Sequence, residues 1–186
     1  MYHTEGIVLA YYNSGEADRF LVIYTKDFGL LRIFAKSIRM AKSKLSRHTM
    51  LFTHTRLSFV YGRDFLRLTD AEFITHFPPH GDNLLAAGKV SRLITRLVNG
   101  EERDDELWWL LESAFSFLRQ TEVVSEDFDL LFGVRALHRL GYVGTLPEEL
   151  KEAVLNNDWA SGVLGHDGFK YLLLPIFNSG LRVSQL

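Results

Sequence analysis

The chain has 186 residues, of which 47% are apolar and 24% are charged, and its formal net charge is −2. This length and composition suit one or two domains with a hydrophobic core, and the lack of cysteine excludes disulfides and cysteine-based zinc sites. The small net charge hides an asymmetry, because residues 1–78 hold 11 Lys and Arg against 7 Asp and Glu, whereas residues 79–186 hold 10 against 16. We therefore predict a basic binding domain over 1–78, followed by a more acidic domain over 79–186.

Neither end of the chain predicts a membrane or secretion segment. The first residues have no basic region, and the apolar stretch Ile7–Tyr12 is too short for a signal peptide. The apolar run Tyr171–Phe177 is far shorter than a membrane span. We expect a soluble, cytoplasmic protein that does not contact a membrane.

The first half of the chain has the composition of β-strands separated by short turns. The predicted strands are Thr4–Tyr12, Arg19–Thr25, Leu30–Lys36, Phe52–Tyr61 and Phe65–Thr69. In the third, Leu31, Ile33 and Ala35 alternate with Arg32, Phe34 and Lys36, which gives one apolar face and one basic and aromatic face. Five strands with one long polar connection predict a small closed barrel of the oligonucleotide/oligosaccharide-binding (OB) type.

A basic run begins inside the third predicted strand. Between Asp27 and Asp64, 36 residues carry eight Lys and Arg and no Asp or Glu. A surface without counter-charges attracts polyanions, although a lone basic run is also typical of a solvated loop. We predict DNA contacts at Arg32, Phe34, Lys36, Arg39, Lys42, Lys44, Arg47, Arg56, Arg63 and Arg67. The Phe34 ring would stack on a base, with ordinary barrel packing as the alternative.

The second half has the periodicity of helices. Phe77-Pro78-Pro79 breaks regular structure and marks the predicted domain boundary. The predicted helices are Asn83–Val98, Leu107–Leu118, Glu126–Leu140, Glu148–Leu155 and Phe169–Phe177. Trp108, Trp109, Phe115 and Phe117 make the second helix apolar nearly all round, so we expect it to be central. Pro175 should kink or end the last helix. The fold class is therefore α+β, with an OB barrel followed by an all-α domain.

The sequence contains no pattern that is typical of a catalytic or metal site. The seven histidines form no ligand pair with helical context, and Pro78-Pro79 separates His76 from His80. We expect no metal, no cofactor and no enzymatic activity. A metal-dependent nuclease using Asp64, Asp70 and Glu72 is a distant alternative, because these acids suit turns and exposed strand positions.

Four motifs in order resemble the N-terminal signature of the recombination mediator family RecO, over about residues 2–73. They are Tyr2-His-Thr-Glu-Gly-Ile-Val-Leu9, Gly15-Glu-Ala-Asp-Arg19, Thr25-Lys-Asp-Phe-Gly29, and Ala35-Lys36 with Lys42-Ser-Lys44-Leu45. The segment Arg135–Tyr142 resembles a later helix of the family more weakly. Many members carry a four-cysteine zinc motif that this chain lacks, and the chain is shorter than usual, so zinc is not carried over.

The resemblance implies a non-enzymatic DNA repair and recombination mediator. Such a protein binds single- and double-stranded DNA, anneals complementary strands and helps load recombinase onto strands coated by single-stranded-DNA-binding protein (SSB). Its implied partners are RecR and the acidic, Phe-ending C-terminal tail of SSB. A protein-interaction adaptor whose barrel never touches DNA is the alternative from another class.

An acidic peptide that ends in Phe needs a hydrophobic pocket with cations beside it. Arg92 and Arg96 are four residues apart on the first predicted helix, and Arg135 and Arg139 are four apart on the third. We predict that one of these pairs binds the SSB tail. The alternative is that all four are solvated or pair with the acids of 101–106.

Overall fold

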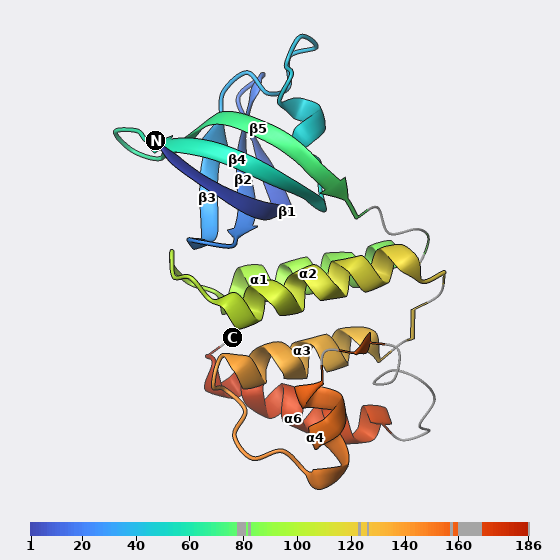
Figure 1. Ribbon diagram of the computed structural model, residues 1–186. Helices are drawn as coiled ribbons and strands as arrows, with labels where there is room; N and C mark the ends of the chain where they lie inside the picture. Colours follow the sequence, from blue (N-terminus) through green and yellow to red (C-terminus); the bar gives the residue numbers. More distant parts are fainter. Residues whose placement is uncertain are drawn as a thin grey trace. The chain divides into compact units, whose positions relative to one another are not determined.

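The computed structural model describes residues 1–77, 81, 83–122, 124–125, 127–156, 158–159 and 169–185. Contacts divide the chain into two compact units (Figure 1). One unit is Met1–Pro78 with Val98–Trp108, and the other is Pro79–Leu97 with Trp109–Leu186. The sequence-based division places 98–108 in the helical domain, whereas these residues belong with the barrel.

The first unit is a closed five-stranded barrel. Its strands are β1 (Tyr2–Ser14), β2 (Asp18–Thr25), β3 (Gly29–Ala35), β4 (Thr53–Tyr61) and β5 (Leu66–His76), and a short 3₁₀ turn covers Ser46–His48 in the β3–β4 connection. The strand order is β1-β2-β3-β5-β4, and β1 closes the barrel by antiparallel pairing with β4. The β3–β5 pair is parallel and short, with Ile33 opposite Leu66 and Phe34 opposite Arg67. The predicted OB barrel is confirmed.

Strand alternation builds the core of the barrel. On β3, Leu31, Ile33 and Ala35 are buried and Arg32 is exposed, as the period of two predicts. They pack with Val8, Leu21, Ile23, Leu57 and Phe59 in one apolar cluster. Strand β5 extends to His76, well past the predicted end at Thr69, because its antiparallel pairing with β4 continues as far as Thr53 opposite His76. Because this extension contains polar residues, the hydrophobic pattern of the sequence does not predict it.

Residues 98–108, which we call the strap, pack on the barrel. The Trp108 indole stacks on the Tyr24 ring with 6.5 Å between centroids, and its edge meets the His54 ring at 5.5 Å. The outward-facing ring of Tyr24 is therefore fully buried. Arg103 reaches Asp27 at 4.0 Å from the turn between β2 and β3. These contacts explain why β2 is buried on both faces from Leu21 to Thr25.

The helical unit contains all of α1 (Asn83–Leu97) and α2 (Asp105–Gln120) from Trp109 onward, followed by α3 (Phe128–Arg139), α4 (Glu148–Leu155) and α6 (Phe169–Val183). The N-terminus of α2 is capped by Asp104, whose Oδ1 accepts a hydrogen bond from Leu107 N–H at 2.8 Å. Helix α3 ends within one residue of the predicted end at Leu140, because Gly141 has φ +78° and Tyr142 N–H donates to Leu137 O at 2.8 Å. No described helix is both long enough and apolar enough to cross a membrane.

The end predicted for the last helix is wrong. Helix α6 does not end at Pro175 but continues to Val183, because it packs closely along α3. A Cβ on Gly180 would lie only 2.9 Å from Leu137 Cδ1, so glycine permits this approach. Most apolar side chains of the second predicted helix are buried, Trp108 and Phe115 among them, whereas Trp109 is 53% exposed.

Candidate nucleic-acid interface

A groove runs along the outer face of the barrel between the β4–β5 loop and the first residues of the strap. Its volume is about 840 Å³. We call it the barrel groove; its aromatic lining is Tyr12, Phe20, Tyr61 and Phe65, and its basic lining is Arg32 and Arg63. Positive side chains beside exposed aromatic rings are the combination that proteins use to hold single-stranded nucleic acid.

Phe34 belongs to an aromatic cluster beside this groove. Its ring centroid lies 5.1 Å from that of Phe20 and 4.8 Å from that of Phe65, and the Phe20 and Phe65 rings meet edge to face at 5.5 Å. Phe34 is half-buried, whereas Phe65 is 39% exposed. Much of the Phe34 ring is therefore engaged in packing within the barrel unit, which is the alternative to base stacking. Phe65 has the more accessible ring for stacking on a base.

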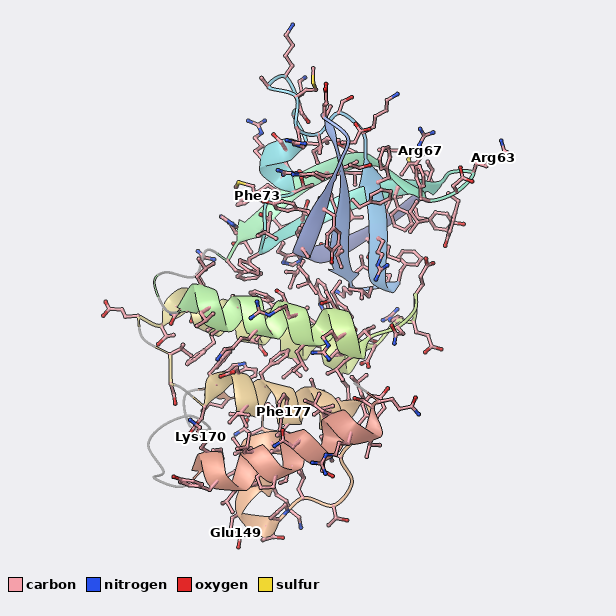
Figure 2. The ribbon with its side chains drawn as sticks, turned by 180° about the vertical axis from the view of Figure 1, so that it is seen from behind. Arg63, Arg67, Phe73, Glu149, Lys170 and Phe177 are labelled. Atoms are coloured by element: carbon pink, nitrogen blue, oxygen red, sulfur yellow. The ribbon has the colours of Figure 1, made fainter. Side chains whose placement is uncertain are left out.

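Three arginines surround the cluster. Arg32 is exposed on β3, and Arg67 lies opposite Phe34 in the short parallel pair between β3 and β5. Arg63 lies in the β4–β5 loop, and Figure 2 shows it with Arg67 at the same edge of the barrel, both pointing outward. Within the described part of the chain, none of the three forms an ion pair with a carboxylate. Their charges are therefore available to an anionic ligand.

The connection between β3 and β4 carries a second set of cations. Its exposed members are Lys36, Arg39, Lys42, Lys44 and Arg47, and Figure 1 shows the connection projecting beyond the end of the barrel. Its base is fixed to the β1–β2 turn, because Arg39 N–H donates to Ala17 O at 2.9 Å and Ser37 N–H donates to Asp18 Oδ1 at 2.6 Å. The side chain of Ile38 is buried beneath it. The loop is therefore a basic projection with an anchored base.

Arg56 lies apart from these cations. Its guanidinium pairs with Glu5 at 3.3 Å and with Glu72 at 3.2 Å. It stands on β4 and is not among the residues that line the barrel groove. Because two carboxylates compensate its charge, we leave Arg56 out of the proposed DNA-binding set.

The helical unit has a groove of its own, which we call the helical groove. Its volume is about 290 Å³, and its apolar lining includes Leu93 of α1 and Phe177 and Leu181 of α6. Lys89, Arg92 and Arg96 of α1 line its rim. Lys89 pairs with Asp129 at 2.9 Å, whereas among the described residues Arg92 and Arg96 form no ion pair and are exposed. Figure 2 shows Phe177 between α6 and α3.

The second predicted arginine pair does not form an exposed site. Arg135 is fully buried and donates hydrogen bonds to the backbone carbonyls of Ala153 and Asp158. Arg139 is half-buried, and its Nη1 donates to Arg135 O at 3.4 Å. The four-residue spacing indicated a shared helix face, but that face points into the protein. Arg135 therefore has a structural role, and Arg139 stands beside it.

Sequence reasoning missed Phe20, Tyr61 and Phe65 as groove residues, and it missed the strap. The register of the β2–β3 hairpin, which sets Phe20 opposite Phe34, was the signal for Phe20. No local pattern indicated that 98–108 returns to the barrel. Among the residues that the structure describes, no three His, Asp or Glu side chains converge as metal ligands.

Comparison with known proteins finds similarity to a family of recombination proteins and to several proteins named as DNA repair proteins. The family described as "Recombination protein O N terminal" matches residues 1–77. The DNA repair protein RecO of Thermodesulfovibrio yellowstonii is 31% identical over 161 residues, which cover 81% of this chain and 64% of that protein. The RecO of Trichodesmium erythraeum is 30% identical over 182 residues, with 87% and 62% covered. A third, from Dehalococcoides mccartyi, is 40% identical over 76 residues, with 41% and 30% covered.

The chain thus spans about three fifths of the length of the first two relatives. The similarity to RecO proteins extends over most of this chain in the first two relatives, and the third shares 40% identity over a 76-residue stretch. The barrel has the strand order of an OB fold, and its N-terminal motifs match the same family. The chain belongs to the RecO family.

Proposed function

We propose that this protein is a DNA repair and recombination mediator whose barrel binds the phosphates and unstacked bases of DNA. The observation that carries this proposal is the meeting of unpaired arginines with exposed aromatic rings at the barrel groove. Arg32, Arg63 and Arg67 would neutralise phosphates, while Phe65, supported by Phe34, would stack on a base.

The β3–β4 connection extends the same surface. Its cations, Lys36, Arg39, Lys42, Lys44 and Arg47, would follow the backbone of a single strand or of one strand in a duplex. Backbone contacts carry no sequence information, so the same residues serve both forms of DNA. A protein that binds two strands through their backbones leaves their bases free to pair, which supports strand annealing as part of the proposal.

We also propose the helical groove as the binding site for the acidic tail of SSB. Phe177 and Leu181 provide an apolar floor for a terminal Phe ring, and Arg92 and Arg96 provide cations for its carboxylates. Binding there would bring the protein to SSB-coated strands, where it would help load recombinase. RecR is a further proposed partner, to which we assign no surface. The proposal includes a cytoplasmic location and no enzymatic activity.

The test of DNA binding is the salt dependence of affinity for labelled oligonucleotides, measured by fluorescence anisotropy at several salt concentrations. Each phosphate contact contributes roughly 0.7 to the slope of log affinity against log salt for single strands. Replacing Lys36, Lys42 and Lys44 together with Ala should flatten this slope by about 2. Phe65→Ala should instead weaken binding by roughly fivefold to a hundredfold without changing the slope, because it removes a stacking surface and no charge.

Arg56→Ala is the matched control, since it removes a cation whose charge is already paired. It should leave both affinity and slope close to those of the unaltered protein. A slope that stays the same in the triple Lys variant contradicts the assignment of the connection to DNA. Absence of any length-dependent binding would favour the adaptor alternative.

A further inference from the structure

A carboxylate lies at the strap end of the barrel groove. Glu101 lines the groove, and Tyr61 Oη donates a hydrogen bond to Glu101 Oε2 at 3.0 Å. This hydrogen bond raises the pKa of the Tyr61 hydroxyl. Tyr61 is 58% exposed, so its ring is accessible for stacking while its hydroxyl holds the carboxylate. A base on this ring would have its edge beside Glu101.

The two ends of the barrel groove therefore carry opposite charges. Arg32 and Arg63 supply positive charge from β3 and the β4–β5 loop, whereas Glu101 supplies negative charge from the strap. Glu101 forms no ion pair within the described ranges. The other acidic lining residue, Asp64, follows Arg63 directly in the loop and lies at the cationic end. A strand in the groove would hold its phosphates near the arginines and away from Glu101.

The strap holds Glu101 in place before any ligand binds. The Glu102 backbone packs against Gly29 so closely that a Cβ on Gly29 would overlap the Glu102 carbonyl oxygen. Arg103 donates to both carboxylate oxygens of Asp105, at 2.9 and 3.0 Å. Fixed groups bind with less loss of conformational entropy than mobile ones, so a single hydrogen bond here can discriminate between ligands.

A carboxylate accepts hydrogen bonds and donates none. Cytosine, adenine and guanine each carry an exocyclic amino group that donates to such an acceptor. Thymine has no amino group, and its one edge donor, N3–H, lies between two carbonyl oxygens that repel a carboxylate. Given DNA binding at this groove, on which the inference rests, we propose that Glu101 reads the base edge and favours bases with an amino group over thymine.

The test compares oligo-dC with oligo-dT of equal length, at slightly alkaline pH where cytosine is unprotonated. The readout is the ratio of the two dissociation constants, which cancels general changes in affinity. The unaltered protein should bind oligo-dC roughly threefold to tenfold more tightly, the effect of one hydrogen bond to a base. In Glu101→Ala the ratio should fall to about one.

Two further variants separate base reading from other effects. Glu102→Ala removes an equal charge from the same strap and should keep the wild-type ratio. Tyr61→Phe keeps the stacking ring but releases the carboxylate, so the ratio should fall while both strands still bind. A wild-type ratio of one, or an unchanged ratio in Glu101→Ala, overturns the inference and leaves DNA binding standing. If neither strand binds the unaltered protein, both the inference and the proposed function fail.

Discussion

The guanidinium of Arg135 lies over the indole ring of Trp159, with 4.2 Å between Cζ and the ring centroid. Its Nε and Nη2 donate to the Ala153 carbonyl at 3.0 and 2.6 Å, and Nη2 also donates to the Asp158 carbonyl at 2.9 Å. Burial lowers the pKa of Arg135 to about 10, so the side chain is still charged at neutral pH. One cation thus joins α3 to the end of α4 and the residues that follow it.

Replacing Arg135 with Met should destabilise the helical unit. The substitution keeps an extended side chain but leaves the carbonyls of Ala153 and Asp158 without their donor. An unsatisfied buried acceptor costs about 1–3 kcal/mol, so we expect a loss of roughly 2–4 kcal/mol in the free energy of unfolding, measured with urea. Arg182→Met, at an exposed position of α6, should change it little. Equal stability of the two variants would contradict this role.

Substitutions at two glycines of the barrel unit distinguish the cost of backbone strain from the cost of disturbing the strap. Gly29 and Gly15 have φ of +64° and +59°, so Ala at either position adopts an unfavourable left-handed backbone. A Cβ at Gly15 meets nothing within 4 Å, whereas at Gly29 it overlaps the Glu102 carbonyl. Gly29→Ala should therefore cost about 1–3 kcal/mol more than Gly15→Ala in thermal or urea unfolding. An equal loss of stability in the two variants would mean that the strap moves away from residue 29 at no cost in free energy.

Stability of the barrel unit should depend on pH through His54. Burial lowers the pKa of its ring below the ordinary value of 6.5, and the nearby Glu5 opposes this only in part. As the pH falls below about 6.5, His54 becomes protonated in the unfolded chain while the buried ring of the folded protein stays neutral. The free energy of unfolding therefore decreases. His54→Gln should lose less stability than the unaltered protein between about pH 8 and pH 5.5.

The exposed His3 provides the control for this measurement. His3→Gln should leave the difference between the two pH values as it is in the unaltered protein. If His54→Gln shows the same pH dependence as His3→Gln, the buried ring is not its source.

Charge reversal on α1 should weaken SSB-tail binding. Arg92→Glu with Arg96→Glu places two carboxylates at the rim of the helical groove, where they would repel an acidic peptide. We expect at least a tenfold loss of affinity for a fluorescent tail peptide, with oligonucleotide affinity nearly intact. Lys151→Glu, an exposed change on α4, should bind the peptide normally. Normal binding by the double variant would place the tail elsewhere.

The barrel was predictable because its signals are local. Alternation on β3 fixes which side chains point inward, and the burial of Leu31 and Ile33 against the exposure of Arg32 follows from it. The basic window was visible for the same reason, since charge needs no tertiary information. The end of β5 could not be predicted from the sequence, because pairing with β4 stabilises a segment with polar residues such as Asp70 and Glu72.

The groove required contacts that are distant in sequence. Phe65 joins Phe20 and Phe34 only when the barrel closes between β3 and β5. The burial of Arg135 likewise depends on carbonyls 18 and 23 residues away, which a four-residue spacing cannot reveal. A helical face is recognisable in a sequence, but whether that face meets solvent or protein is decided by the rest of the chain.

The strap makes the barrel unit discontinuous along the chain. The family match ends at residue 77, and the unit resumes at 98–108, after the whole of α1 in the sequence. A fragment cut at residue 78 would lack Trp108 and Glu101, which would leave the Tyr24 ring uncovered and the barrel groove open at one end. Such a fragment would present more apolar surface and a different nucleic-acid site from the whole chain. Its solubility and base preference would not represent those of the intact barrel unit.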